Sequence, residues 1–256
     1  MDKNERVKRF NSFSDDFFET RDQEYKLPEG YLWIRKDVKS RFLSSVIYGL
    51  ALVFGVIYCR LFLHVRIKGR KKLKAAKKTG AFIYGNHTQP VGDVFIPALA
   101  AFPKRIYTVV STANMAIPFI GKILPYLGAL PIPDTVNAMK QFNRAVESRV
   151  EENKCVVIYP EAHVWEYCTF VRPFPDTSFR YAVKYNKPAY CMTTTYQKRR
   201  FGKKPVATVY IDGPFTADKS DSMRENAAEL RNEIHSCMTN RSKMSTYEFI
   251  KYVKTD

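Results

Sequence analysis

Cysteine is scarce in this chain of 256 residues, and several familiar signatures are absent. The five cysteines are an odd, scattered set with no CxxC spacing: Cys59, Cys155, Cys168, Cys191 and Cys237. This pattern argues against a disulfide framework and a zinc site, and it favours a reducing compartment. The sequence has no G-x-S-x-G elbow of a serine hydrolase. It also has no RNP-like aromatic run and no GXXG loop. We therefore expect neither a zinc site nor a nucleic-acid partner.

Long apolar runs are also rare, and one stands out. Residues 42–59 contain no charge, and as a helix they extend roughly 27 Å, close to the ~30 Å hydrocarbon core of a bilayer. The run begins too far from the N-terminus for a cleavable signal peptide. The mean hydropathy of -0.32 argues against a polytopic membrane protein. We predict a charged region at 1–40, a membrane-associated helix or helical hairpin at 41–65, and one domain at 66–256. A buried core helix is the alternative for the apolar run.

The net charge is +17, which favours an anionic membrane surface, an acidic protein or nucleic acid as partner. Basic residues lie on both sides of the apolar run, so the positive-inside rule gives no clear orientation. A re-entrant or interfacial helix pair with both ends cytoplasmic explains this charge as well as a full span does. We expect membrane lipids as partners and an active site on the cytoplasmic face. The basic cluster at 197–204 is either a solvated hairpin loop or a contact for headgroups or an acidic acyl carrier protein. The oligomeric state is left open.

Hydrophobic patterning beyond residue 80 predicts an α/β domain. Strands are expected at 81–84, 106–110, 155–159, 189–196 and 206–212. Helical spacing appears at 94–102 and 136–150, and Ser222-x-x-Glu225 is a capping box that opens a last helix to about residue 237. Strands that alternate with helices indicate a mixed, mostly parallel central sheet flanked by helices, preceded by the N-terminal membrane-associated segment.

Two loops at predicted strand ends carry reactive side chains. One holds His87 and Asp93, and the other holds Glu161 and His163. Sites in open α/β sheets gather beyond the carboxyl ends of strands, so the two loops can face one cleft. A neutral imidazole can take the proton of a hydroxyl that attacks a thioester, and a carboxylate can fix its tautomer. Backbone N–H groups near the helix that starts around Asp93 are candidates for stabilising the oxyanion. The alternative is that Asp93 only caps this helix.

The order of motifs along the chain resembles that of a known family. The motifs are Gly85-Asn86-His87-Thr88-Gln89-Pro90-Val91-Gly92-Asp93, the segments 117–124 and 127–132, Val157-Ile158-Tyr159-Pro160-Glu161, and 186–190. Over about residues 60–215 this set resembles the glycerolipid acyltransferases (the lysophosphatidate and glycerol-phosphate acyltransferases). The resemblance implies that His87 is the base and that Asp93 orients it. It implies that Asn86 and Glu161 belong to the substrate-binding part of the site. It also implies acyl-CoA or an acyl carrier protein as the thioester co-substrate, with no other cofactor and no metal.

The sequence departs from the family pattern at three places. Five residues separate His87 from Asp93, where the family has four. Asp134 stands where the second motif ends in arginine, and Glu161-Ala162-His163-Val164 replaces Glu-Gly-Thr-Arg. The missing arginines suit bidentate phosphate binding. Either Arg172, Lys140 and His163 replace them, or the acceptor lacks that phosphate; we favour the second.

These observations predict a membrane-associated O-acyltransferase. It would move a fatty acyl group from a thioester to the hydroxyl of a lysolipid or glycerol-phosphate-type acceptor by direct His–Asp general-base catalysis. One alternative is a non-catalytic binder of anionic membrane or nucleic acid, based on the charge. Another is a thioester or lipid hydrolase, in which the His–Asp pair activates water.

Overall fold

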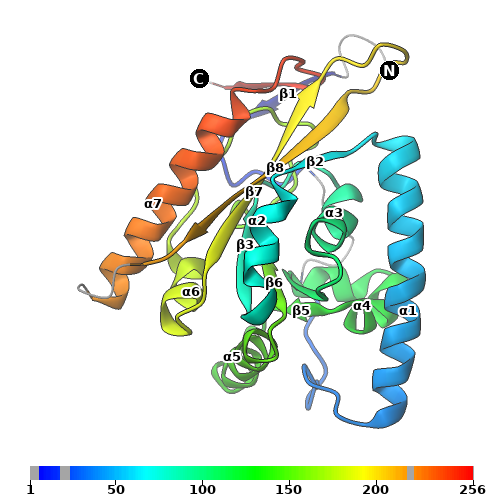
Figure 1. Cartoon of the computed structure of the whole chain (residues 1–256), viewed down its shortest axis with the longest axis vertical. Helices are drawn as coiled ribbons and strands as arrows, with labels where there is room; N and C mark the ends of the chain where they lie inside the picture. Colours follow the sequence, from blue (N-terminus) through cyan, green and yellow to red (C-terminus); the bar gives the residue numbers. More distant parts are fainter. Residues whose placement is uncertain (1–5, 18–23, 218–221, 256) are drawn as a thin grey trace.

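A seven-stranded sheet forms the centre of the molecule in the computed structural model, which describes residues 6–17, 24–217 and 222–255 (Figure 1). The strand order is β2-β8-β7-β3-β6-β4-β5, and every neighbouring pair is parallel except the antiparallel β7–β8 hairpin. The predicted mixed, mostly parallel sheet is therefore confirmed. The strands are β2 (Arg66–Lys68), β3 (Ala81–Gly85), β4 (Ile106–Val110), β5 (Ala129–Pro131), β6 (Cys155–Ile158), β7 (Ala189–Gln197) and β8 (Val206–Phe215).

Helices cover both faces of this sheet. On β3, Phe82 and Tyr84 pack toward one hydrophobic cluster, while Ala81 and Ile83 pack toward the other. This alternation follows from the two-residue period of a strand, and burial on both faces explains why the central strands are continuously apolar. The first cluster lies under α5 (Val136–Glu151), α6 (Arg180–Lys184) and α7 (Met223–Ser242). The second lies under α2 (Arg70–Ala75) and α3 (Gly92–Ala101).

The apolar run forms one long helix. The α-helix α1 (Val38–Ile57) continues through a π-helical turn at Tyr58–Phe62, so the result is a single helix and not a hairpin. Asp37 caps it by accepting a hydrogen bond from the Ser40 amide at 2.7 Å. Only 11% of its apolar window is buried, which excludes a core helix. It is long and apolar enough to cross a membrane.

This helix lies along the domain and does not project from it (Figure 1). Near its start, the Ser44 hydroxyl donates to the Tyr126 carbonyl oxygen at 2.7 Å, next to the end of α4 (Ile120–Leu127). Near its end, the rings of Phe54 and Phe95 of α3 lie 5.5 Å apart. Domain contacts at both ends therefore fix one side of α1, and its opposite, apolar side stays exposed.

The N-terminal region is folded onto the domain. The strand β1 (Val7–Phe10) pairs in parallel with β9 (Lys251–Lys254) near the C-terminus. Phe10 and Phe17 pack against the ring of the fully buried Trp165, with centroids 4.8 and 5.2 Å away. Residues 1–40, predicted as a separate charged region, thus supply a strand and core side chains among their described positions.

Candidate active site

The loop after β3 is fixed to the neighbouring strand by Asn86. Its side-chain amide donates to the Thr194 carbonyl oxygen at 3.0 Å, and its Oδ1 accepts from the Thr194 amide at 2.8 Å. Asn86 is buried. Both polar atoms of its side chain bond to β7, so Asn86 anchors the loop.

The structure brings His87 and Asp93 together. The distance between His87 Nδ1 and Asp93 Oδ2 is 2.8 Å. The same buried carboxylate oxygen accepts hydrogen bonds from the amides of Thr88 and Gln89, each at 2.9 Å. The loop therefore wraps around Asp93 and accommodates the extra residue between the two side chains. These bonds come from residues before the helix, so Asp93 orders the loop and is not a simple helix cap.

The pairing selects the tautomer of a neutral imidazole. Asp93 Oδ2 accepts a hydrogen from Nδ1 of His87, and in this tautomer Nε2 has the lone pair. The His87 side chain is 20% exposed. Among the residues that the structure describes, none forms a hydrogen bond with Nε2. This is the arrangement that a general base requires.

The amides next to this pair are already engaged. Those of Thr88 and Gln89 donate to Asp93, the Asp93 amide donates to the Gln89 carbonyl oxygen, and the Val94 amide donates to the Val91 carbonyl oxygen. These four amides therefore cannot serve as the oxyanion donors that the sequence predicts at the start of this helix.

Two tyrosines that the sequence analysis missed complete the support of the loop. The ring of Tyr159, just after β6, stacks on His87 with centroids 4.4 Å apart, and its hydroxyl donates to the Asp93 carbonyl oxygen at 2.7 Å. The Tyr196 hydroxyl accepts from Gln89 Nε2 at 3.0 Å and donates to the Thr88 carbonyl oxygen at 3.2 Å. Burial, with a smaller effect of the Asp93 charge, raises the pKa of both tyrosines well above the usual value. Both therefore stay protonated and can donate.

Glu161 connects the second loop to the first. Its Oε2 accepts from the His87 amide at 3.0 Å and from Arg172 Nη2 at 3.1 Å, and its Oε1 accepts from the Arg172 amide at 2.9 Å. Each of the two side chains is 1% exposed. The Arg172 guanidinium also donates to the His163 and Phe13 carbonyl oxygens. The expectation that Arg172 holds an acceptor phosphate is thus not supported, since its charge is buried and paired.

The other two predicted site residues, His163 and Lys140, have no described contact with His87. Ala162 adopts a φ of 64°, the left-handed region that glycine favours, at the position where the family pattern has glycine. His163 Nδ1 lies 3.2 Å from Asp16 Oδ2. Lys140 is exposed in α5, and no described hydrogen bond or ion pair joins it to the loops of the site. The geometry therefore supports Glu161 as a positioning residue and leaves His163 and Lys140 without a shown role.

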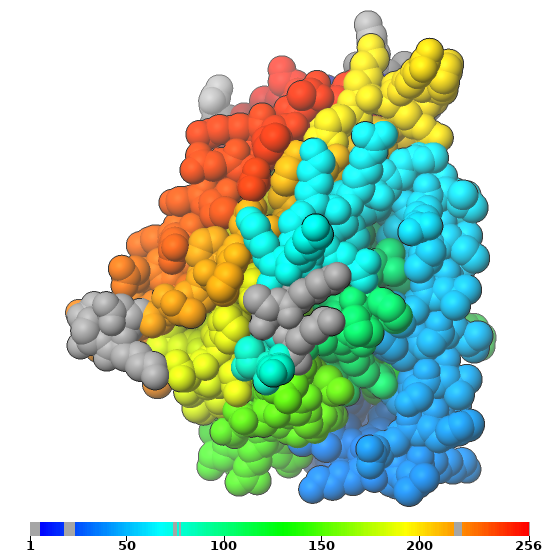
Figure 2. Space-filling view, viewed as in Figure 1, coloured from blue at the N-terminus to red at the C-terminus, as the bar shows by residue number. Residues whose placement is uncertain are grey.

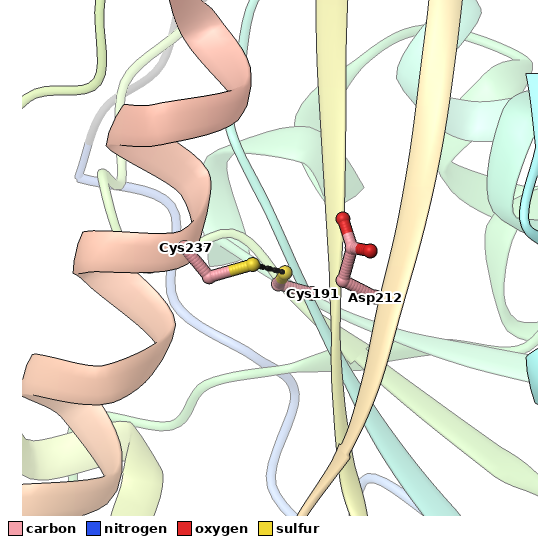
Figure 3. Close-up of side chains that lie close together, drawn as sticks. All are labelled: Cys191, Asp212 and Cys237. Atoms are coloured by element: carbon pink, nitrogen blue, oxygen red, sulfur yellow. Dashed lines mark hydrogen bonds between the residues drawn. The ribbon is translucent and has the colours of Figure 1, made fainter.

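A second group of side chains, which has metal-ligand character, joins β7, β8 and α7 (Figure 3). The ligand atoms of Cys191, Asp212 and Cys237 lie within 4.8 Å of one another, and the two sulfurs are 3.5 Å apart. However, Lys72 Nζ donates to Asp212 at 2.6 Å, and Arg241 donates to it at 2.7 and 2.8 Å. Two cations that already neutralise the carboxylate disfavour a metal cation beside it.

The fold and the site together define an α/β domain with an imidazole–carboxylate pair at the carboxyl edge of a mostly parallel sheet. A family model described as Acyltransferase matches residues 64–211, more than half of the chain. The chain belongs to this acyltransferase family, as the motif resemblance predicted.

A solved structure has a similar fold. It is the crystal structure of the 1-acyl-sn-glycerophosphate (LPA) acyltransferase PlsC from Thermotoga maritima, with a TM-score of 0.56 and 17% sequence identity. The similarity covers 82% of this chain and 83% of that chain. A comparison with curated proteins finds no match.

Proposed function

We propose that this acyltransferase is membrane-associated and transfers a fatty acyl group from a thioester to the hydroxyl of a lysolipid. The observation that carries the proposal is the 2.8 Å contact between His87 Nδ1 and Asp93 Oδ2, with Nε2 of His87 left without a described partner. The family membership and the PlsC-like fold support acyl transfer as the reaction.

The chemistry follows from this geometry without a covalent acyl-enzyme. Nε2 of His87 takes the proton of the acceptor hydroxyl while the hydroxyl oxygen bonds to the thioester carbonyl carbon. The Asp93 carboxylate stabilises the imidazolium that forms. When the tetrahedral intermediate collapses, the carbon–sulfur bond breaks, and the imidazolium returns its proton to the leaving thiolate. The products are an ester and a free thiol, and His87 is neutral again.

We propose that the acceptor does not need a phosphate monoester for binding. Val164 and Asp134 stand at the two arginine positions of the family pattern, and Arg172 is occupied by Glu161. A phosphate that binds without such donors loses hydrogen bonds to water, and the protein does not replace them. A lysolipid with a neutral or zwitterionic headgroup suits this site better than lysophosphatidate.

Membrane attachment through α1 follows from its exposed side. Leu50 is 67% exposed, and Phe119, just before the neighbouring α4, is 84% exposed. Exposed apolar side chains on two packed helices form a patch that favours a membrane. Figure 2 shows α1 along one edge of the molecule, where its outer side is uncovered. Because one side of α1 is fixed to the domain, we propose that it lies in the interface on the cytoplasmic leaflet and does not cross the bilayer.

The acyl donor approaches from the same edge of the sheet as His87. The β7–β8 hairpin extends beyond the carboxyl end of β3 and carries exposed basic side chains at 198–204. Positive charge there favours an acidic acyl carrier protein or the phosphates of coenzyme A. Either carrier supplies the thioester that the mechanism requires.

The test measures acyl transfer from acyl-CoA and from acyl carrier protein to a panel of lysolipids. The panel includes lysophosphatidate, lysophosphatidylcholine, lysophosphatidylethanolamine and monoacylglycerol. We expect the wild type to prefer an acceptor other than lysophosphatidate, and Asp93→Asn to lose activity with all of them. Thioester loss without any lysolipid would indicate a hydrolase. Equal activity of the wild type and Asp93→Asn would reject the mechanism.

A further inference from the structure

A large basic cavity lies at the edge of the sheet opposite His87. Its volume is about 620 Å³. The segment 31–36, the first turns of α1 and the end of α4 line one part of it. Arg105 and Lys154, which immediately precede β4 and β6, line another part. Since His87 follows the carboxyl end of β3, which is parallel to β6, the cavity belongs to the amino edge.

The length of α1 gives the distance between the cavity and the loop that carries His87. Ser44 lines the cavity. Leu63, just after the helix, lies beside the loop that carries His87 and Asp93. A Cβ added at Gly92 in this loop would lie 2.8 Å from Leu63 Cδ1. Leu63 is 19 positions after Ser44 along the helix, which corresponds to roughly 28 Å. A lysolipid whose hydroxyl reaches His87 cannot place its headgroup in this cavity.

The charge of the cavity is strongly positive. Its lining includes six cationic side chains and one carboxylate, Glu152. The cations are Arg35, Lys36, Arg41, Arg105, Arg149 and Lys154. Clustered like charges in one concave site repel each other unless an anion joins them.

Three of these arginines are held in place by aromatic rings. The guanidinium groups of Arg35, Arg105 and Arg149 lie over the rings of Tyr126, Tyr48 and Tyr107 at 4.9, 4.5 and 4.4 Å. Each carries one buried nitrogen that has no hydrogen-bond partner within the described part of the chain. Arg105 Nη2 also donates to the Ser44 hydroxyl and the Tyr126 carbonyl oxygen, and Arg149 Nη1 pairs with Glu152 at 3.1 Å. These two arginines therefore shape the wall of the cavity. The cations that the described residues leave without a hydrogen bond or ion pair are Arg35, Lys36, Arg41 and Lys154, and such donors suit a phosphate, which offers several acceptor oxygens.

The cavity lies at the start of α1, which indicates that the bound phosphate belongs to a lipid headgroup. Arg41 and Ser45 line the cavity and also a second hollow that Val38 and Phe42 complete. Val38 and Phe42 are exposed apolar residues on the membrane-facing helix. A headgroup in the cavity would therefore place its acyl chains along the exposed side of α1.

We propose that this cavity binds the phosphate headgroup of an anionic phospholipid at a site separate from the acceptor site. The lipid form of this ligand rests on the membrane attachment proposed above. The phosphate site itself does not, because it depends only on the arginine cluster.

The experiment uses the full chain and the fluorescence of Trp33, which lines the cavity. The chain has two tryptophans, and Trp33→Phe identifies the signal. The protein is titrated with phosphatidylcholine vesicles that contain or lack phosphatidic acid, and separately with inorganic phosphate. We expect a Trp33 response to phosphatidic acid vesicles that Arg35→Gln/Arg105→Gln weakens roughly tenfold or more.

Controls separate a built site from general attraction. Lys203→Gln/Lys204→Gln removes the same charge from the exposed β7–β8 hairpin and should leave the Trp33 response unchanged. If Arg105→Gln fails to fold, Lys36→Gln/Arg41→Gln takes its place, since Lys36 and Arg41 are exposed. An equal loss in the hairpin variant, or no Trp33 response, would overturn the proposal. Equal affinity for inorganic phosphate would overturn the assignment to a lipid.

Lipid binding in the cavity can be tested separately from acyl transfer. Acyl transfer in neutral detergent should stay within about twofold in the cavity variants, since the cavity lies far from His87. A wild type without acyl transfer but with the Trp33 response would remove the proposed function and keep this site.

Discussion

Replacing Arg172 with methionine separates a structural role from a headgroup-binding role. The variant would leave the buried Glu161 carboxylate without its cation and would also break the contact with the Trp165 ring at 4.6 Å. Removing one partner of a buried ion pair costs about 3–5 kcal/mol in the free energy of unfolding. For a domain of this size that corresponds to a drop in melting temperature of roughly 6–20 °C.

Thermal unfolding in neutral detergent measures this drop, and acyl-transfer kinetics on the same samples measure kcat and KM. Lys140→Met is the matched control, because it also removes one cation but from an exposed position, where changes usually stay within about 0.5 kcal/mol. The double variant Glu161→Gln/Arg172→Met should lose less stability than the sum of the single variants. A melting temperature unchanged by Arg172→Met, together with a raised KM for phosphate-bearing lysolipids, would refute the structural role.

Three further outcomes are expected. Tyr159→Phe loses the hydrogen bond to the Asp93 carbonyl oxygen but keeps the ring on His87, so unfolding measurements should show a loss of about 1 kcal/mol and kcat should stay close to wild type. Hydrogen bonds from Arg241 and Lys72 lower the pKa of Asp212 to about 2. Their stabilisation is therefore complete above the unfolded pKa of about 4 and is lost as the pH falls through about 2, so acid unfolding scans should show a smaller loss in Asp212→Asn than in wild type. Leu50→Asp places a charge on the exposed side of α1, and vesicle flotation should show binding weakened roughly tenfold or more.

Much of the fold was accessible from local patterns. The sequence predicts the strands β3, β4, β6, β7 and β8, because runs rich in β-branched, aromatic and other apolar residues favour strands. The capping box at Ser222 and Glu225 is present, and Thr135 caps α5 by accepting from the Ala138 amide. The last helix was predicted too short, since it continues to Ser242.

Other elements leave no local signal. The strands β2 and β5 have three residues each, too few to show a period. The pairing of β1 with β9 joins residues at opposite ends of the chain. Such contacts depend on the completed domain and cannot be derived from neighbouring residues.

The candidate site also has some features that the sequence predicts and others that it does not. The two loops that carry His87 and Glu161 could be placed together because each follows a strand of one parallel sheet. The burial of Arg172 could not be predicted, since an isolated arginine in a sequence is normally a surface residue. Tyr196 was missed because its partner Thr88 lies 108 positions away.

The rate of acyl transfer by His87→Gln tests the central claim most directly. The His87 side chain is partly exposed and has one described side-chain hydrogen bond, to Asp93, so the variant should keep its melting temperature. Loss of the base should lower kcat roughly 10²–10⁴-fold on the preferred lysolipid. A folded His87→Gln variant that acylates this lysolipid at the wild-type rate would contradict the account.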